Sequence, residues 1–460
     1  MQAFNPYLPS WEYIPDGEPH IFGNRVYVYG SHDEFNGESA CLNDYVCWSA
    51  PTDAPENWEF HGTIFRKDQD PDYVPGKYLY APDVTPGPDG AYYLYYGLSM
   101  DGTLSVARSE TPTGPFSFYG KVCYSDGRIL GQADDDVYQF DPAVLLDDDG
   151  RVWLYTGLGY CRDNKIQRFG NRIMDGAYCT ELMPDMKTVK TPPVRILPKK
   201  TLAMGTDFED HAFFEACSIR KIQGIYYLVY SSALSHELCY AVSSKPNGGF
   251  RFGGVIVSNC DVGMNFLPDG QLANHFGNNH GGMVKLQDQW YIFYHRQTNN
   301  HGNSRQGCAE PITMLPDGRI PQVEMTSCGL NGGPLEGTGE YPAGIACQLF
   351  SLEGDYPYIT QEDGKQLITK LKTGSVAGFK YFDLSNTHRI TLTCRGNSGT
   401  LRILDNIHGK VLSEIFFSGA SQWQTCSAPL SGGTIRSGLF ITAETDGSID
   451  LLSISLSTAF

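Results

Sequence analysis

The chain has 460 residues, of which 41% are hydrophobic and 19% charged, a composition that excludes a disordered chain and leaves room for two or three folded domains. Its 34 lysines and arginines stand against 52 acidic residues, and the net charge of -18 argues against nucleic acid and anionic membrane surfaces as partners. No stretch approaches the ~20 apolar residues of a membrane helix.

Five short segments alternate aromatic and aliphatic residues and end in a small or polar residue, which is typical of β-strands. Their starts lie 60 to 74 residues apart, about the length of one four-stranded sheet with its turns. The segments are residues 26–30, 92–97, 152–157, 226–231 and 290–295. This repeat predicts an all-β fold whose sheets are arranged radially around one axis.

A polar residue precedes each of these strands by 9 to 11 residues, at the end of a second, shorter strand signal. The five residues are Asp16, Asp83, Asp141, Glu215 and His280. Equivalent positions on the innermost strands of a radial array face the axis, so four acids and one histidine would converge there. A single Asp beside a strand is more often a turn or capping residue. Five polar residues at equivalent positions indicate function, because burying unpaired carboxylates costs folding free energy.

Converging carboxylic groups suit glycoside hydrolysis, in which one group protonates the leaving oxygen and the other activates water or attacks carbon. Groups on opposite sides of an axis favour the wider separation of ~6.5–9.5 Å that admits a water and inverts the anomeric configuration. A third carboxylate close to the acid raises its pKa by like-charge repulsion.

The ordered set of motifs resembles glycoside hydrolase family 43 over roughly residues 5–325. The motifs are residues 15–16 with 27–33, residues 80–83, residues 140–142 with 147–150, residues 214–215 and residues 279–281. The resemblance implies a five-bladed β-propeller and an inverting enzyme, such as an α-L-arabinofuranosidase, a β-xylosidase or an arabinanase. It implies that Asp16 is the general base, that Asp141 orients the acid and modulates its pKa, and that Glu215 is the general acid.

The same resemblance implies roles for further residues around the sugar. His280 would face a calcium ion or a water at the propeller centre, with a satisfied core histidine as the alternative. Asp83 is expected at the sugar pocket or directly behind it, and Arg296 as a substrate contact or a counter-charge to the acids. Tyr80 and Phe35 are expected to supply an aromatic platform.

Two departures from the family pattern leave alternatives open. Glu18 follows Asp16 closely and is a rival for the base, although the offset to the next strand favours Asp16. Glu209 is a distant rival for the acid. Ala216 follows Glu215 where a glycine often stands in the family, which crowds the strand.

The pattern changes after about residue 326. Residues 331–344 contain five glycines and two prolines, so we expect a propeller domain over 1–326, a linker over 327–344 and a second domain over 345–460. The second domain is expected to be a β-sandwich, because strand signals recur at short spacing. They are residues 390–395, 400–404, 411–417, 438–442 and 449–456. Residues 378–383, Trp423 and residues 451–456 resemble a family 6 carbohydrate-binding module, in which Trp423 would stack on a sugar or pack at the rim.

We therefore expect an exo-acting, inverting glycosidase that releases terminal L-arabinofuranose or D-xylose from plant-derived oligosaccharides, without an organic cofactor. The alternatives are an endo-arabinanase, a non-catalytic carbohydrate-binding propeller, and a fructan-cleaving enzyme that retains configuration. The 13 cysteines form no Cys-x-x-Cys pair, and the first residues carry no basic patch followed by an apolar stretch. Both observations favour the cytoplasm, and the oligomeric state stays open.

Overall fold

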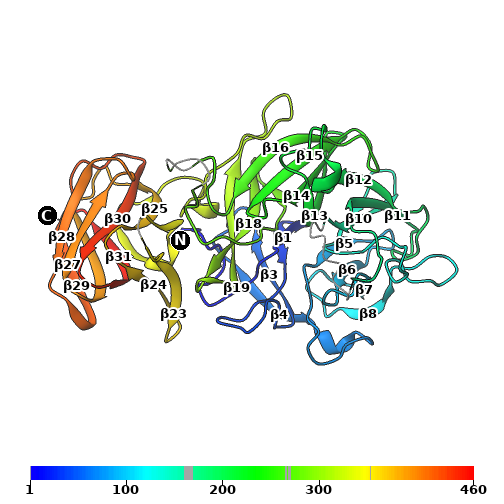
Figure 1. Cartoon of the computed structure of the whole chain (residues 1–460), viewed down its shortest axis with the longest axis horizontal. Helices are drawn as coiled ribbons and strands as arrows, with labels where there is room; N and C mark the ends of the chain where they lie inside the picture. Colours follow the sequence, from blue (N-terminus) through cyan, green and yellow to red (C-terminus); the bar gives the residue numbers. More distant parts are fainter. Residues whose placement is uncertain (1, 160–168, 265–266, 268–270, 353, 460) are drawn as a thin grey trace.

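The computed structural model describes residues 2–159, 169–264, 267, 271–352 and 354–459. Strands dominate both halves of the chain, and the described helical residues belong to short 3-10 turns, among them Lys67–Gln69, Lys200–Leu202, Gly329–Asn331 and Ala343–Ile345. None of the described helices has the length and apolar character needed to cross a membrane. Figure 1 shows two domains side by side, the first coloured blue to green and the second yellow to red.

The first domain contains five antiparallel sheets that follow one another along the chain. The first two are β1 (Glu18–Phe22), β2 (Arg25–Tyr29), β3 (Tyr45–Pro51), β4 (Glu59–Phe65), and β5 (Asp83–Pro86), β6 (Tyr92–Gly97), β7 (Leu104–Ser109), β8 (Ser117–Lys121). The third and fourth are β9 (Ala143–Leu146), β10 (Val152–Leu158), β11 (Gly176–Leu182), β12 (Val194–Pro198), and β13 (Phe213–Ile222), β14 (Ile225–Ser232), β15 (Glu237–Ser243), β16 (Arg251–Ser258). The fifth is β17 (Met283–Leu286), β18 (Gln289–Thr298) and β19 (His301–Ile312).

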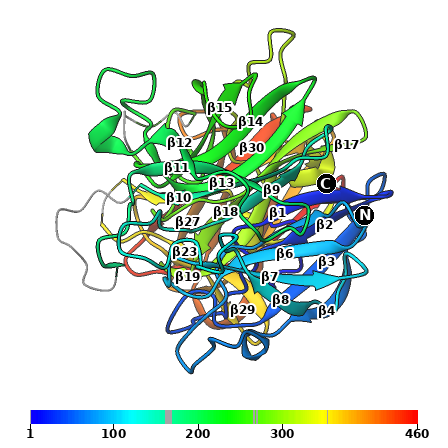
Figure 2. The same cartoon turned by 90° about the vertical axis from the view of Figure 1, so that its right-hand side faces the viewer.

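These sheets close into a ring. Hydrophobic clusters of described residues are shared by successive sheets, and one cluster joins Val26 and Val28 of the first sheet to Tyr291 and Phe293 of the fifth. The innermost strands β1 and β17 pack together, as do β5 and β9, and β9 and β13. Figure 2 shows the sheets around a common centre, with the second domain behind them. The predicted all-β, radially repeated fold is therefore confirmed.

The five aromatic segments form the second strand of each sheet, namely β2, β6, β10, β14 and β18. These strands read as near-continuous aromatic and aliphatic runs because both of their faces are covered by neighbouring sheets. The polar residues that precede them lie at the beginning of the innermost strands, where Asp83 opens β5 and Glu215 lies in β13. Asp16, Asp141 and His280 lie two or three residues before β1, β9 and β17.

The second domain consists of two six-stranded sheets that enclose one hydrophobic core. One sheet contains β20 (Leu335–Glu336), β22 (Gln348–Ser351), β25 (Ser375–Asp383), β27 (Gly399–Leu404), β28 (Val411–Phe417) and β30 (Ser437–Thr445). The other contains β21 (Gly339–Pro342), β23 (Tyr358–Glu362), β24 (Lys365–Leu371), β26 (Arg389–Gly396), β29 (Ala420–Pro429) and β31 (Ile449–Ser457). All five strand segments expected in this region are strands here.

The linker predicted over residues 327–344 is not a free connection. Within it, β20 pairs in parallel with β25, and β21 pairs with β31. Leu335 and Tyr341 are buried in the core of the second domain. The glycines and prolines indicated a linker, but pairing with strands more than 40 residues further along the chain makes the segment part of the sandwich.

Candidate active site

A cavity of about 200 Å³ opens where the innermost strands begin. Its walls include Asp16, Asp141, Glu215, His280 and Tyr80, all of them expected site residues. Asp16, Asp141 and His280 are buried, each with 5% of its surface exposed, and Glu215 is partly buried. The fold thus brings together three carboxyl groups from three different sheets.

The backbone around these carboxyl groups adopts the left-handed conformation that L-residues avoid. The φ angles are 56° at Asp16, 46° at Asp141 and 69° at Ala216, directly after Glu215. Such conformations cost of order 1–3 kcal/mol each and persist where the surrounding structure enforces them, as in active sites. The backbone N–H of Ala216 donates a hydrogen bond of 3.1 Å to Asp141 Oδ2, so Asp141 holds the segment that carries Glu215.

Asp16 is held in its ionised form. Burial alone would raise the pKa of its carboxyl, but Arg305, His295 and His280 outweigh burial and lower the pKa to about 2. The Arg305 guanidinium donates from Nη1 to both carboxylate oxygens of Asp16, at 3.1 and 3.4 Å. A general base must be unprotonated at the working pH, and Asp16 meets this requirement.

Glu215 has the opposite protonation preference. Burial, followed by the negative charge of Asp16, raises the pKa of Glu215 to about 7. Burial and the charges of Glu215 and Asp16 also raise the pKa of Asp141 well above its ordinary value. Both Glu215 and Asp141 therefore favour their protonated forms more strongly than ordinary carboxyl groups do. Carboxyl groups whose pKa values are displaced in opposite directions mark an acid and a base.

Three further residues complete the site, and sequence reasoning did not identify them. Asp33 accepts bonds of 2.9 and 3.0 Å from Nε and Nη2 of Arg305, and this fork orients Arg305 toward Asp16. His295 accepts the backbone N–H of Asp16 at Nδ1, at 3.2 Å, and its Nε2 lies 2.8 Å from Asn278 O. Burial lowers the pKa of His295 to about 3, so the ring is neutral. Asp33 is the last residue of the motif at residues 27–33, whereas no local sequence pattern distinguishes Arg305 from other arginines.

Three expected substrate contacts do not line the cavity. Arg296 is buried with its guanidinium bound to the carbonyl oxygens of Ala346 and Gly344, at 2.8 and 2.6 Å, so Arg305 takes the place expected of Arg296. Phe35 packs against Tyr13, with ring centroids 5.8 Å apart. Asp83 is the first residue of β5 and contacts the two neighbouring sheets instead. It lies 2.6 Å from His20 Nε2 and accepts a hydrogen bond from the Val144 N–H.

The rivals for acid and base also lie outside the cavity. Glu18 Oε1 accepts hydrogen bonds from Ser218 at 2.9 Å and pairs with Arg220 at 2.7 Å. Glu209 is exposed and accepts the N–H of Gly205. The offset that favoured Asp16 over Glu18 agrees with this placement.

Next to His280, a group of oxygen and nitrogen atoms suits a cation. Single ligand atoms of Glu18, His20 and Asp83 lie within 4.8 Å of one another. Glu18 Oε2 is buried and has no hydrogen-bond partner among the described residues. Burial lowers the pKa of His280, which keeps the imidazole neutral and able to bind a metal, and Glu18 and Asp83 act on it electrostatically. Two buried carboxylates with one free oxygen fit a hard cation such as calcium.

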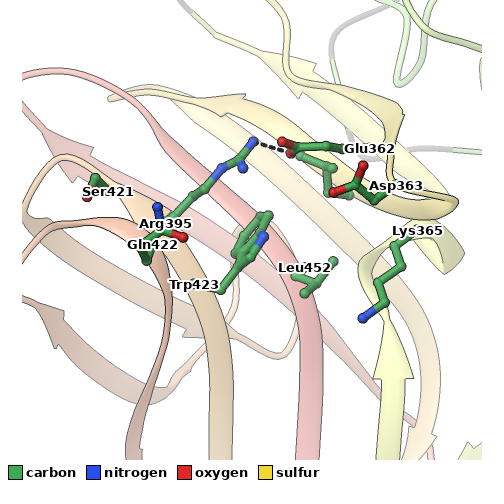
Figure 3. Close-up of a pocket in the computed structure, with 9 residues that line it drawn as sticks. Glu362, Asp363, Lys365, Arg395, Ser421, Gln422, Trp423 and Leu452 are labelled. Atoms are coloured by element: carbon green, nitrogen blue, oxygen red, sulfur yellow. Dashed lines mark ion pairs between the residues drawn. The ribbon is translucent and has the colours of Figure 1, made fainter.

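A second cavity, of about 310 Å³, lies in the second domain, far along the chain from the carboxyl cluster. Figure 3 shows Trp423 standing between Arg395 and the hairpin that carries Asp363 and Lys365. The Arg395 guanidinium lies 4.4 Å from the Trp423 ring centroid and pairs with Glu362 at 2.6 Å. Carbohydrate binding by this domain stays a prediction.

Comparison with known proteins gives consistent matches. The family model described as "Glycosyl hydrolases family 43" matches residues 19–320. The chain is 48% identical over 478 aligned positions to a xylosidase/arabinosidase of Thermoclostridium stercorarium, with 99% of each chain covered. One similar solved structure is a family 43 β-xylosidase/α-arabinofuranosidase from a compost microbial metagenome, in complex with xylotriose and in a calcium-free form. It is 25% identical to this chain, with a TM-score of 0.54, and the match covers 70% of this chain and 97% of the other. A Bacillus subtilis family 43 arabinoxylan arabinofuranohydrolase with cellotetraose shares the fold over 98% of this chain and 97% of the other, at 21% identity and a TM-score of 0.53.

Proposed function

The chain belongs to the glycosyl hydrolases of family 43, and on that premise we propose that it is an inverting, exo-acting enzyme that releases terminal D-xylose or L-arabinofuranose from oligosaccharides. The observation that carries the proposal is one cavity holding Asp16 with a lowered pKa and Glu215 with a raised pKa. The xylosidase/arabinosidase identity of the relative from Thermoclostridium stercorarium supports the choice of sugars.

The proposed mechanism assigns one proton transfer to each end of the site. Protonated Glu215 donates its proton to the leaving glycosidic oxygen as the bond to the anomeric carbon breaks. Ionised Asp16 removes a proton from a water that attacks this carbon from the opposite face, which inverts the configuration. Asp141 holds the Glu215 segment through the Ala216 N–H, and Arg305 keeps Asp16 ionised and oriented.

The geometry favours this function over the alternatives. A cavity of about 200 Å³ is smaller than the ~300–1,000 Å³ of ordinary ligand pockets, and it suits one terminal sugar better than an internal stretch of polymer. This supports exo action over an endo-arabinanase. A non-catalytic carbohydrate-binding propeller needs no protonated carboxyl beside an ionised one, so the opposed pKa values support an enzyme.

Hydrolysis of paired aryl glycosides tests the proposal. We expect the protein to cleave a β-D-xyloside, an α-L-arabinofuranoside or both, and proton NMR of the first product to show the anomer opposite to that of the substrate. Reducing-end sugar analysis of a linear oligosaccharide should show single residues released from one end. A retained anomer, or a ladder of internal fragments, would contradict the inverting exo assignment.

We further propose that calcium binds at the propeller centre near His280, with Glu18, His20 and Asp83 as the residues that hold it. Such an ion would supply positive charge near the carboxyl cluster. Because a ligand that binds the folded state stabilises it, calcium at ~100 times its Kd should add about 2.7 kcal/mol to the free energy of unfolding. We expect the Tm to rise with calcium, fall with chelator, and lose this response in Glu18→Gln. Equal Tm values in calcium and chelator would exclude the ion.

A further inference from the structure

The strand β19 lies between the carboxyl cluster and the second domain. Successive side chains of a strand point to opposite faces, so Arg305 faces Asp16 while its neighbour Gln306 faces the other way. Gln306 Oε1 accepts hydrogen bonds from Arg296 Nη2 at 3.0 Å and from Gln366 Nε2 at 3.1 Å. Gln366 belongs to β24 of the second domain and is 4% exposed. One buried contact between the domains therefore lies one residue from the counter-ion of the general base.

The same glutamine also contacts the segment that carries the base itself. Gln366 Nε2 lies 3.4 Å from the Tyr13 hydroxyl, and this hydroxyl donates to Gln361 Oε1 at 3.0 Å. Tyr13 precedes Asp16 by three residues, and Gln306 Nε2 donates to the carbonyl of Ser10 on the same segment at 3.0 Å. Gln366 thus bridges the two segments that supply the Asp16–Arg305 ion pair, which are 289 residues apart.

A second set of contacts holds the hairpin between β18 and β19. The Asn299 N–H donates to the Ile359 carbonyl at 2.7 Å, and the Thr360 hydroxyl donates to Asn299 Oδ1 at 2.9 Å. Asn299 adopts a left-handed φ of 52°, and Gly302, three residues later, lines the catalytic cavity. The hairpin that closes one side of the cavity is therefore hydrogen-bonded to β23 of the second domain.

We propose that the second domain is a positioning element for the catalytic base, acting through Gln366 on the segments of Asp16 and Arg305. A tethered accessory module would meet the propeller through a flexible linker and few buried polar contacts. Here the contacts are buried, and the connecting segment is part of the sandwich. The inference rests on the proposed function, because positioning of Asp16 matters for its role as the base.

Gln366→Leu tests the proposal, with Thr369→Val as the matched control. Both variants remove polar atoms from β24, but Thr369 Oγ1 donates at 2.7 Å to Asp450 inside the second domain. Since small misplacements of catalytic groups cost up to ~100-fold, we expect Gln366→Leu to lower kcat about tenfold while KM stays within about twofold. Thr369→Val should match the wild type. A purely structural role would reduce both variants in proportion to lost folded protein, which circular dichroism quantifies.

A measurement that needs no substrate separates this proposal from the assigned activity. Hydrogen–deuterium exchange should increase in residues 10–16 and 299–306 of Gln366→Leu and remain unchanged in Thr369→Val. If the wild type hydrolyses no glycoside while exchange responds as stated, the assigned activity fails and the coupling stands. Unchanged exchange in Gln366→Leu overturns the positioning role.

Should Gln366→Leu fold poorly, Tyr13→Phe removes only the hydroxyl that Gln366 and Gln361 contact. It is expected to lower kcat as well, and the double variant should lose less than the product of the two single losses, because both changes break the contact between Gln366 and Tyr13. If the kcat losses of the two single variants were additive in the double variant, the proposed coupling through Gln366 would be wrong.

Discussion

Replacing Glu215 by glutamine is expected to lower kcat/KM for an oligosaccharide by about 10²–10⁴-fold, the usual contribution of a general acid. Glutamine keeps the size of the side chain but has no proton to give to the leaving oxygen. An aryl glycoside with an acidic phenol as leaving group should lose much less, because its departure needs little protonation. The measurement is a comparison of kcat/KM for the two substrates in both proteins.

The pH dependence gives an independent reading of the same residue. Glu215 must be protonated to act, and its pKa is raised to about 7, so activity should fall as the pH rises through about 7. In Glu215→Gln this alkaline decline should disappear from the residual activity. The control is Glu209→Gln, since Glu209 is exposed on the surface and should leave rate and pH profile unchanged. If Glu215→Gln showed the same fall in activity at alkaline pH as the wild type, another residue would be the general acid.

Replacing Asp16 by asparagine is expected to lower kcat by about 10²–10⁴-fold, with the loss shared by all substrates whatever their leaving group. Asparagine is nearly isosteric but cannot take a proton from water. Arg305 keeps its charged partner Asp33, so the variant is not left with an unpaired buried charge and should fold. Steady-state kinetics on the aryl glycoside and the oligosaccharide provide the comparison.

Binding separates the base from a residue that merely holds substrate. Calorimetric titration with an oligosaccharide that the wild type cleaves should give Asp16→Asn an affinity within about threefold of that of Glu215→Gln, since both side chains act mainly in the transition state. Asp317→Asn, at an exposed turn, serves as the surface control. If Asp16→Asn retained more than about a tenth of wild-type kcat, Asp16 would not be the general base.

Local patterns along the chain are enough to predict the strands and the register of the carboxyl cluster. Strand alternation and turn residues are local properties, so the five aromatic segments identified the second strand of each sheet. Similar offsets from these strands then placed Asp16, Asp141 and Glu215 at equivalent positions, and the closed ring brings these positions together. The same offset separated Asp16 from Glu18, two residues away.

The partners that shift the pKa values of these carboxyl groups depend on contacts between distant parts of the chain. Arg296 and Arg305 lie on neighbouring strands β18 and β19, and which of them faces the cavity depends on the pairing register, so the sequence favoured the wrong arginine. Asp33 meets Arg305 across 272 residues of chain. The segment predicted as a linker contains strands β20 and β21 for the same reason. These strands form because distant strands accept and donate their hydrogen bonds, and no local sequence pattern predicts that pairing.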